Sequence, residues 1–409
     1  MIVAVWYGAG MNLLFIHQGL PGQFKHLVPA LAADRRHRVA AITQDRTYAE
    51  PGVRVVTYRP TRYAHAGTHH YVRLFENAVL HGQAVLRHAM ALRDEGFRPD
   101  VVVAHPGWGE ALFLRDVFPR AKLLHFCEFF YHGRGADVGF EPGEGSMDAI
   151  CRARARNAHL LLSLEACDAG WSATRWQRDR HPAAFRDKIS VVFDGIDLSV
   201  VRPDARARFA LPDGRVLTRE VPVVSYVARN LEPYRGFPSF MRALPAVLAA
   251  NPAAQVVIVG GDGVSYGQPA PGGVTWRAAM EAELGPLDPA RVHFTGPLVY
   301  RDYLSLLQVS RAHVYLTVPF VLSWSCAEAL AAGCALVASH TPPVEEFVRH
   351  GENGLLVDFH DPAAIAVAVG AVLGGGHEGL RAEARRTALA CFDLARCLPR
   401  QVELIEGLG

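Results

Sequence analysis

The chain has 409 residues, a length that excludes one ordinary domain and favours two. Half of the residues are apolar and 20% are charged, so large cores are available and extensive disorder is excluded. The net charge of +2 argues against a nucleic-acid binder, which needs a strongly basic surface.

The seven cysteines are scattered along the chain, without any C-x-x-C pair. An odd and unpaired set is typical of a reduced cytoplasmic protein, and it offers neither a disulfide framework nor a zinc site. The nineteen histidines likewise show no H-E-x-x-H or comparable spacing. We therefore predict that the protein binds no metal.

The apolar segment at residues 1–16 lacks the features of a targeting segment. Residues 1–16 have no Lys or Arg ahead of the apolar run, show no clear cleavage site and are too short to cross a bilayer. We predict a soluble, cytoplasmic protein. We treat residues 1–10 as a dispensable extension ahead of a first strand at Asn12, with Met11 as a candidate start.

The first half of the chain alternates apolar strands with helical patterns. We expect strands at residues 12–17, 39–43, 53–58, 100–104, 123–127 and 189–193, and helices over residues 24–31, 70–95 and 148–162. Continuous apolar strands separated by helices are typical of a parallel sheet that is buried on both faces. The turn at Gly19 and Gly22 is either a phosphate approach or a plain turn between strand and helix.

Two polar residues stand at the ends of neighbouring strands in this half. His105 follows the strand at 100–104, and Glu128 follows the strand at 123–127. Catalytic residues in open α/β sheets collect beyond the carboxyl ends of the strands, so both are candidate catalytic residues. After Glu128 come three aromatic residues and then a polar, Gly-rich segment, residues 132–145, which we predict to be a lid or a binding loop.

A second alternation occupies the rest of the chain. Residues 200–220 are polar and broken by prolines, so we expect a linker. Strands are then expected at residues 223–228, 255–260, 292–295, 313–317, 335–339 and 354–357. Two doubly wound parallel sheets in sequence predict two Rossmann-like domains, at 1–200 and 201–392, that face each other across a cleft.

A helix is expected to begin directly after the strand at 313–317. Its free N–H groups at Leu322, Ser323, Trp324 and Ser325 would attract a phosphate, and the two serines could add hydroxyl donors. Glu328 lies about one turn into this helix, where an acceptor-only carboxylate suits a sugar diol. The alternative is a Glu that only complements the helix dipole.

Two arginines follow the first strand of the second alternation. Arg229 and Arg235 could hold a diphosphate through bidentate bonds and stabilise the negative charge that grows as it leaves. The alternative is a pair of surface arginines. Gly261, Gly296 and Leu298 stand in the turns that follow the next two strands.

These features together resemble the family 4 (group 1) retaining glycosyltransferases of GT-B fold. In that family, Glu-x7-Glu precedes Ala, a small residue, Gly and an apolar strand, and here Glu328 occupies the second Glu position. The first Glu position holds Phe320, a departure at the residue that usually contacts the donor sugar. The family also places Arg and then Lys-Gly where this chain has Arg229 and Arg235-Gly236. HQGLPGQFKHL and HPGWGEALFLRDVFP resemble a bacterial subgroup in which the PFVLSWS variant is normal.

The resemblance implies an enzyme that moves a sugar from a nucleoside-diphosphate sugar to the hydroxyl of a glycan, lipid-linked or small-molecule acceptor. It implies retention of the anomeric configuration, with no metal and no cofactor besides the donor substrate. Orientation and charge stabilisation would come from Arg229, Arg235 and the helix end at Ser323. It further implies that a helix at 393–409 packs back on the first domain. A peripheral contact with the inner face of the membrane is left open.

Because Phe320 stands where the resembled family has a Glu, two alternatives to an active glycosyltransferase stay open. One is a catalytically inactive, sugar-nucleotide-binding partner subunit. Another is a different enzyme on the same architecture, such as a sugar-nucleotide epimerase or a phosphorylase, although no site for the lysine-bound pyridoxal phosphate of a phosphorylase is recognisable. Release of nucleoside diphosphate on addition of an acceptor would separate the transferase from the others.

Overall fold

The computed structural model describes residues 10–143 and 145–409. The chain divides into two compact units. Unit 1 comprises the chain up to Gly195 together with Leu394–Gly409, and unit 2 comprises Ile196–Asp393. The sequence placed the corresponding boundaries after residues 200 and 392. The expectation that residues 1–10 are dispensable concerns a segment of which all but Gly10 lies outside the described residues.

Unit 1 contains a seven-stranded parallel sheet with the order β3-β2-β1-β4-β5-β6-β7. The strands are β1 (Asn12–Ile16), β2 (Arg38–Thr43), β3 (Val53–Thr57), β4 (Val101–Ala104), β5 (Lys122–Phe126), β6 (Ala169–Ser172) and β7 (Ile189–Val191). Every residue of β4 is buried, as expected for a central strand that is covered on both faces. The prediction of a doubly wound parallel sheet is confirmed here.

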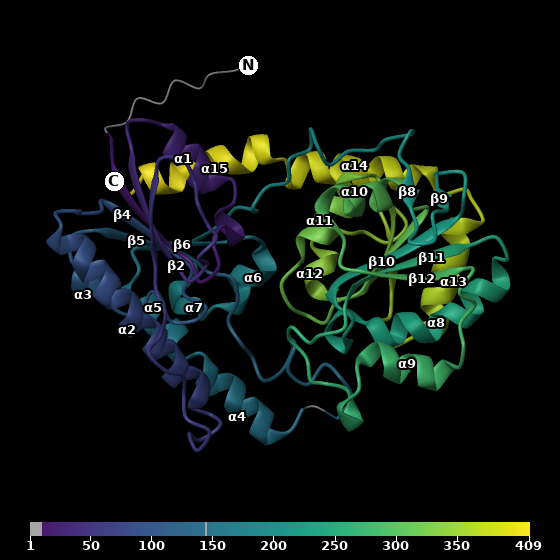
Figure 1. Ribbon diagram of the computed structural model, residues 1–409, viewed down its shortest axis with the longest axis horizontal. Coiled ribbons are helices and arrows are strands. Elements are labelled where there is room, and N and C mark those ends of the chain that lie inside the picture. The colour runs from purple at the N-terminus through teal and green to yellow at the C-terminus, as the bar shows by residue number, and fades with distance from the viewer. Residues whose placement is uncertain (1–9, 144) are drawn as a thin grey trace. The chain divides into compact units, whose positions relative to one another are not determined.

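The helices of unit 1 include one that comes from the end of the chain (Figure 1). They are η1 (Gly22–Phe24), α1 (Leu27–Ala33), α2 (Arg73–Asp94), α3 (Leu114–Val117), α4 (Met147–Arg156), α5 (Ala158–Ala166), α6 (Arg175–Arg180), α7 (Ala183–Arg186) and α15 (Leu394–Glu406). In Figure 1, α15 lies beside α1, and the two are in contact. The Gln401 amide of α15 also donates a 2.8 Å hydrogen bond to the carbonyl oxygen of Phe193.

Two predictions for unit 1 were wrong. The helix expected over residues 148–162 is two helices, α4 and α5, which meet at Asn157. The Asn157 side chain accepts a 2.9 Å hydrogen bond from Tyr131 N and donates one of 2.7 Å to Tyr131 O, so it is committed to a loop at the point where the helix breaks. Strand β6 was missed because its sequence, AGWS, lacks the β-branched residues that mark a strand.

Unit 2 contains a six-stranded parallel sheet with the order β12-β11-β10-β13-β14-β15. The strands are β10 (Val223–Asn230), β11 (Gln255–Gly261), β12 (Val292–Gly296), β13 (Ala312–Tyr315), β14 (Ala335–Ser339) and β15 (Leu355–Val357). Each of these strands overlaps a range predicted from the sequence. The second doubly wound sheet is therefore confirmed as well.

The helices of unit 2 follow the strands as crossovers. They are η2 (Pro233–Arg235), α8 (Phe237–Ala250), η3 (Pro271–Gly273), α9 (Trp276–Leu284), α10 (Tyr300–Val309), α11 (Trp324–Ala331), α12 (Pro342–Glu345), α13 (Pro362–Leu373) and α14 (Glu378–Cys391). Helix α8 packs against α13, and α11 packs against α14. Within the described part of the chain, no single helix is long and apolar enough to cross a membrane. The pair α13 and α14 passes that test only jointly, with a bend of 101° between them.

The segment predicted as a polar linker is part of unit 2. It forms a small antiparallel hairpin of β8 (Phe209–Ala210) and β9 (Val216–Leu217). Phe209 and Leu217 are buried in one cluster with Val257 and Leu306. Sparse apolar residues between prolines therefore extend a core, a role that composition alone did not indicate.

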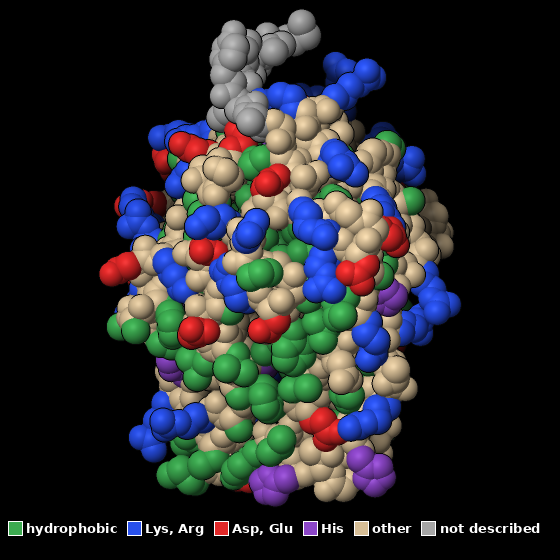
Figure 2. Space-filling view, turned by 90° about the vertical axis from the view of Figure 1, so that its left-hand side faces the viewer, with side chains coloured by type: hydrophobic (Ala, Val, Ile, Leu, Met, Phe, Trp, Pro, Cys, Tyr) green, Lys and Arg blue, Asp and Glu red, His purple; other side chains and the backbone are tan. Residues whose placement is uncertain are grey.

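Large apolar side chains are also exposed on unit 1. Leu74 and Met90 of α2 and Leu161 and Leu162 of α5 are examples, with exposed fractions between 39% and 52%. Figure 2 shows apolar side chains gathered on one side of this unit, with Lys and Arg side chains around them. Gatherings of this kind often mark a contact surface.

Each sheet has one point where the strand order reverses. In unit 1 it lies between β1 and β4, and the segments that leave these strands begin at His17 and His105. In unit 2 it lies between β10 and β13, and the segments that leave them begin at Leu231 and Leu316. Crossovers diverge to opposite faces at such a point, which leaves a crevice at the carboxyl ends of the strands where ligands bind.

Candidate functional site

Two histidine rings and a tryptophan meet at the reversal point of unit 1. The His17 and His105 ring centroids are 5.1 Å apart, with the ring planes at 75°. Trp108 stacks on His105 at 4.5 Å and 23°, and its centroid lies 5.4 Å from that of His17. Trp108 is 37% exposed, so its ring forms an outer wall beside the two histidines.

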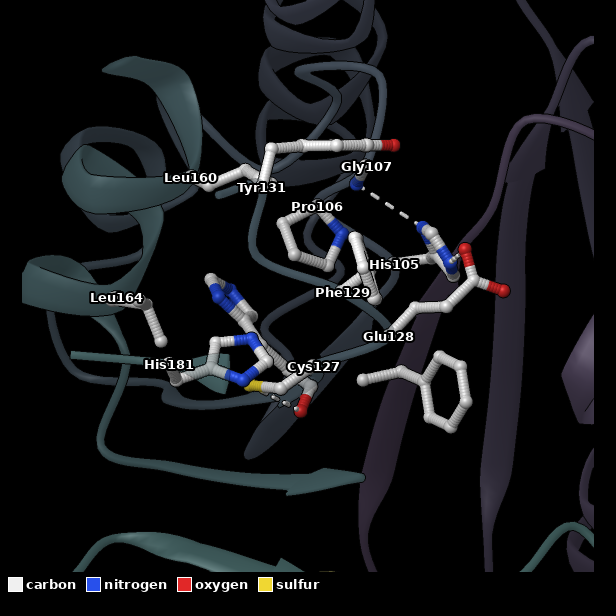
Figure 3. Close-up of a pocket in the computed structure, with 12 residues that line it drawn as sticks. His105, Pro106, Gly107, Cys127, Glu128, Phe129, Tyr131, Leu160, Leu164 and His181 are labelled. Atoms are coloured by element: carbon white, nitrogen blue, oxygen red, sulfur yellow. Dashed lines mark hydrogen bonds and ion pairs between the residues drawn. The ribbon is translucent and has the colours of Figure 1, made fainter. Parts of the chain in front are cut away.

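Glu128 follows β5, the neighbour of β4, and its carboxylate lies beside the His105 ring (Figure 3). The distance from His105 Nε2 to Glu128 Oε2 is 3.4 Å, and Gln23 Nε2 donates a 2.7 Å hydrogen bond to Glu128 Oε1. Burial opposes ionisation, but His105, followed by His17 and Gln23, holds the pKa of Glu128 below its usual value. The side chain is 28% exposed, so an ionised carboxylate faces solvent here.

His17 is held in one orientation by the turn that follows β1. Its Nδ1 accepts a 3.0 Å hydrogen bond from Gly19 N, and its Nε2 lies 2.8 Å from Gln23 Oε1. Burial and then the neighbouring His105 lower the pKa of His17 to about 4, so the ring is neutral at neutral pH. Gly22 has a φ of +44°, and a Cβ there would lie 2.4 Å from His17 Cε1.

The contacts of the two glycines fit the plain turn between strand and helix better than the phosphate approach, the two alternatives that the sequence left open. The Gly19 N–H is engaged by an imidazole, and Gly22 is small because the His17 ring occupies the adjacent space. The sequence pointed to the turn but not to His17, which stands directly at its start. A polar residue at the end of the first strand was the available signal.

A small cavity lies behind His105 and Glu128 (Figure 3). Its volume is about 30 Å³, and Cys127 and His181 also line it. That space can hold water but not a sugar. Burial raises the pKa of the Cys127 thiol well above its usual value, which makes it a poor nucleophile. A substrate must therefore approach from the open side, where Trp108 lies.

A buried polar cluster around Glu110 lies next to the site. The Tyr58 hydroxyl donates a 2.5 Å hydrogen bond to Glu110 Oε1, and Gln18 Nε2 lies 3.4 Å from the same oxygen. His81 Nδ1 is 3.8 Å from Glu110 Oε1. Glu110 is fully buried, and burial raises its pKa. The sequence analysis missed this group, although Glu110 lies in the same HPGWGE segment as His105.

Arg235 occupies the reversal point of unit 2. Its Nη1 donates a 2.6 Å hydrogen bond to Thr317 Oγ1, and its carbonyl oxygen accepts one of 2.7 Å from the Tyr226 hydroxyl. Gly236 follows with a φ of +67°, the left-handed conformation that lets the chain turn from η2 into α8. Arg229 is exposed, and its side chain has no hydrogen bond or ion pair within the described residues. The structure places the two arginines in different environments.

Helix α11 begins at the same point, with Ser323 as its N-cap. Ser323 N donates a 3.0 Å hydrogen bond to the Tyr315 hydroxyl, and the Ser323 and Ser325 hydroxyl oxygens are 2.6 Å apart. The first N–H groups of a helix have no partner inside it, and Ser325 stands in this first turn with its hydroxyl beside that of Ser323. Leu322 is buried and holds the turn in place.

Glu328 lies within α11, and only 5% of it is exposed. Its two oxygens accept hydrogen bonds of 2.8 Å each from the hydroxyls of Tyr300 and Tyr303. Burial and the Glu328 charge raise the pKa of both tyrosines, so these remain donors. The two tyrosine hydroxyls therefore fix the orientation of the carboxylate. The sequence analysis did not identify the two tyrosines.

Phe320, at the position where the resembled family has its first Glu, is buried among aromatic rings. Its ring centroid is 5.3 Å from those of both Tyr234 and Tyr266. The loop that carries Tyr266 is pinned by Glu232, whose carboxylate accepts hydrogen bonds from the backbone N–H groups of residues 265–267. The Arg235 guanidinium lies 5.7 Å from the Tyr266 ring centroid. An aromatic group therefore replaces a carboxylate beside the arginine.

The remaining predicted residues of unit 2 lie at the ends of β11 and β12. A Cβ on Gly261 would approach Asn230 Oδ1 to 2.7 Å, so this glycine serves a close packing contact. Gly296 has a φ of +67° and open space around it. Leu298 is half-buried against the core cluster that contains Val257. Packing or backbone conformation accounts for each of the three without a ligand.

The fold and the two sites define a class of protein. Two doubly wound units, each with polar groups at the reversal point of its sheet, are the GT-B arrangement of glycosyltransferases. Sucrose-phosphate synthase from Thermosynechococcus elongatus superimposes with a TM-score of 0.70 at 20% identity, over 97% of this chain and 99% of that one. Anabaena Alr3699/HepE in complex with UDP-glucose gives 0.65 at 15% identity, over 97% and 100%.

Sequence comparison then assigns the two halves. Residues 35–201 match the model of "Glycosyl transferase family 4 group", and residues 221–374 match that of "Glycosyl transferases group 1". Most of the chain is thus similar to glycosyltransferase domains, one family model matching each half.

Among curated proteins, the chain resembles D-inositol 3-phosphate glycosyltransferases. The protein of Acidothermus cellulolyticus is 32% identical over 230 residues, which cover 54% of this chain and 47% of the relative. The protein of Nocardia farcinica is 35% identical over 203 residues, 47% of this chain and 41% of the relative. The matched region thus spans about half the length of these relatives.

Proposed function

We propose that the protein is a retaining glycosyltransferase that moves a sugar from a nucleoside-diphosphate sugar to an acceptor hydroxyl. The observation that carries the proposal is that Arg235, at the reversal point of unit 2, acts electrostatically on Cys326 in the first turn of α11. Arg235 is held there by Thr317, and the serine hydroxyls at 323 and 325 lie at the helix end. A fixed guanidinium beside outward N–H groups suits a diphosphate.

In this proposal, unit 2 binds the donor. Arg235 and the start of α11 hold the diphosphate and stabilise the charge that develops on it as the glycosidic bond breaks. Glu328, oriented by the two tyrosines, accepts hydrogen bonds from the ribose diol. Arg229, exposed at the end of β10, swings onto the diphosphate when the donor binds.

Unit 1 binds the acceptor in this proposal. The ionised Glu128 accepts a hydrogen bond from a second hydroxyl of the acceptor ring, beside the reacting one, and the exposed Trp108 face packs against that ring. Binding both substrates in defined orientations supplies much of the rate enhancement. A phosphate oxygen of the donor takes the proton, so the reaction needs no metal ion.

Incubation with a panel of nucleoside-diphosphate sugars, UDP-glucose first, tests the proposal. We expect release of the nucleoside diphosphate to rise when hydroxyl acceptors are added, with and without a chelator. NMR of the product should show the anomeric configuration of the donor. Binding of the donor without any transfer would favour the inactive partner subunit. Conversion of the sugar nucleotide without an acceptor would favour the epimerase.

A peripheral membrane contact is part of the same proposal. The apolar gathering on unit 1 and the basic side chains around it support such a contact (Figure 2). Sedimentation with vesicles of anionic and of neutral lipid would test it. Equal and negligible binding to both kinds of vesicle would count against it.

A further inference from the structure

The hydrogen bonds around His17 form a chain in which each group donates to the next, from Gly19 N–H through His17 and Gln23 to Glu128. Gly19 N–H donates to His17 Nδ1, and a ring nitrogen that accepts a hydrogen bond carries no proton. The proton of the neutral ring is therefore on Nε2, from which it is donated to Gln23 Oε1. With its oxygen occupied in this way, Gln23 directs its amide nitrogen to Glu128 Oε1.

His105 lies beside the other oxygen of Glu128, Oε2, and its Nε2 is the nitrogen that faces it. Gly107 N donates a 3.1 Å hydrogen bond to His105 Nδ1, as Figure 3 shows, so the proton of this ring is on Nε2. That nitrogen faces Glu128 Oε2 at 3.4 Å. Glu128 Oε1 thus accepts a hydrogen bond from a neutral amide, and Oε2 lies beside His105 Nε2 without a hydrogen bond between them. Glu128 can only accept hydrogen bonds, and it keeps its charge.

No lysine or arginine of the described residues neutralises that charge. Among the residues that the structure describes, no lysine or arginine makes a hydrogen bond, an ion pair or a ring contact with His17, Gln23, His105, Trp108 or Glu128. An anionic group next to Glu128 would meet an uncompensated like charge, whereas a hydroxyl would find an acceptor. The exposed face of Trp108 adds an apolar surface on the same side.

We infer that this site selects a neutral polyhydroxy ring as the acceptor, bound through a hydroxyl on Glu128 and the ring face on Trp108, and that it rejects a phosphate at that position. The inference rests on the proposed transferase function and adds the acceptor class to it. It also separates this chain from the relatives, whose name specifies a phosphorylated inositol. The feature that distinguishes the site is the Glu128 carboxylate, which accepts hydrogen bonds and contacts no lysine or arginine among the described residues.

The test compares acceptors that differ only in a phosphate. The full chain is incubated with UDP-glucose and with myo-inositol or inositol 3-phosphate, and separately with glucose or glucose 6-phosphate, and UDP release is measured. We expect kcat/KM for the neutral member of each pair to exceed that of the phosphorylated member by about tenfold or more. A preference for the phosphorylated members, in turnover or in binding, would overturn the inference.

The variant Glu128→Gln isolates the role of the charge. It keeps the shape of the side chain and should lower kcat/KM for neutral acceptors, while the ratio between neutral and phosphorylated acceptors falls by about tenfold. Glu165→Gln, on the exposed side of α5, is the matched control and should leave the ratio unchanged. An unchanged ratio in Glu128→Gln would overturn the inference.

Saturation-transfer NMR on the natural chain and on Glu128→Gln measures acceptor binding directly. It gives the preference for neutral over phosphorylated acceptors without any turnover. The Arg235→Ala variant separates a failure of this inference from a failure of the proposed function, since it should lose transfer while its acceptor preference in the binding experiment stays the same. If acceptors bind with the expected preference but no donor is consumed, the transferase proposal fails and the acceptor site stands.

Discussion

Arg235 and Thr317 are joined by a 2.6 Å hydrogen bond across the reversal point of the unit 2 sheet. Arg235 comes from the segment after β10, and Thr317 comes from the segment after β13, far along the chain. The bond fixes a flexible side chain in position before any ligand binds. Such preorganisation is what a charge stabiliser needs, because no binding energy is then spent on ordering it.

Arg235→Ala should lower turnover at saturating donor by about a hundredfold, equivalent to about 3 kcal/mol, the usual effect of removing one preorganised charge stabiliser. Arg235→Lys should be milder, because it keeps the charge but loses the planar fork. Arg229→Ala should have a comparable effect if Arg229 reaches the diphosphate. Steady-state release of nucleoside diphosphate is the measurement.

Arg242→Ala is the matched control for these variants. Arg242 lies on α8 of the same unit, and its Nε forms an exposed ion pair of 2.6 Å with Glu283. Its loss should leave turnover within about twofold, since an exposed pair contributes little. Near-normal turnover in both Arg229→Ala and Arg235→Ala would show that neither arginine holds the diphosphate.

Glu328→Gln should weaken nucleotide binding by roughly 1–3 kcal/mol, the range for one charge-assisted hydrogen bond. The Tyr300 and Tyr303 hydroxyls lose an ionic acceptor as well, so the melting temperature should fall by a few degrees. Calorimetric titration with the nucleoside diphosphate, well below the melting temperature, separates the two effects. Tyr303→Phe removes one donor but keeps the carboxylate, and it should retain most of the affinity.

Phe320→Glu restores the residue of the resembled family, but it should not improve catalysis. Phe320 is 4% exposed and touches the rings of Tyr234 and Tyr266, so the new carboxylate would be buried against aromatic rings. We expect a loss of about 3 kcal/mol of stability or more, seen as a lower melting temperature. Phe320→Leu is the apolar control. A gain in turnover at unchanged stability would identify Phe320 as a degraded catalytic position and favour the inactive subunit.

Glu110 should make the protein less stable as the pH rises. Burial raises its pKa above the unfolded value of about 4.3, so the folded state binds the proton more tightly. The stabilisation is complete below the unfolded pKa and is lost as the pH rises through the folded pKa. Glu110→Gln keeps an acceptor for Tyr58 without the titration.

The melting temperature of Glu110→Gln, relative to the natural chain, should therefore increase between pH 5 and pH 8. The exposed Glu165→Gln variant should show no such trend. A difference between Glu110→Gln and the natural chain that stays constant over this range would contradict a buried, proton-bearing Glu110.

The alternation of apolar strands and helical patterns was sufficient to predict both parallel sheets, because a strand buried on both faces needs a continuous apolar run. The runs at β4 and β14 are examples. Chemical type and position also singled out His105 and Glu128, which stand one and two residues beyond the ends of β4 and β5. Local rules failed at Asn157 and at β6, where contacts with distant residues override local propensity.

The sequence by itself determined which residues stand at the carboxyl ends of the strands, because that depends only on where each apolar run ends. Only the tertiary structure decided what these residues touch. The strand order makes β1 adjacent to β4, which brings His17 against His105. It makes β10 adjacent to β13, which brings Arg235 to Thr317. Contacts between residues so far apart along the chain follow from sheet order and side-chain packing, and neither leaves a periodic trace in the sequence.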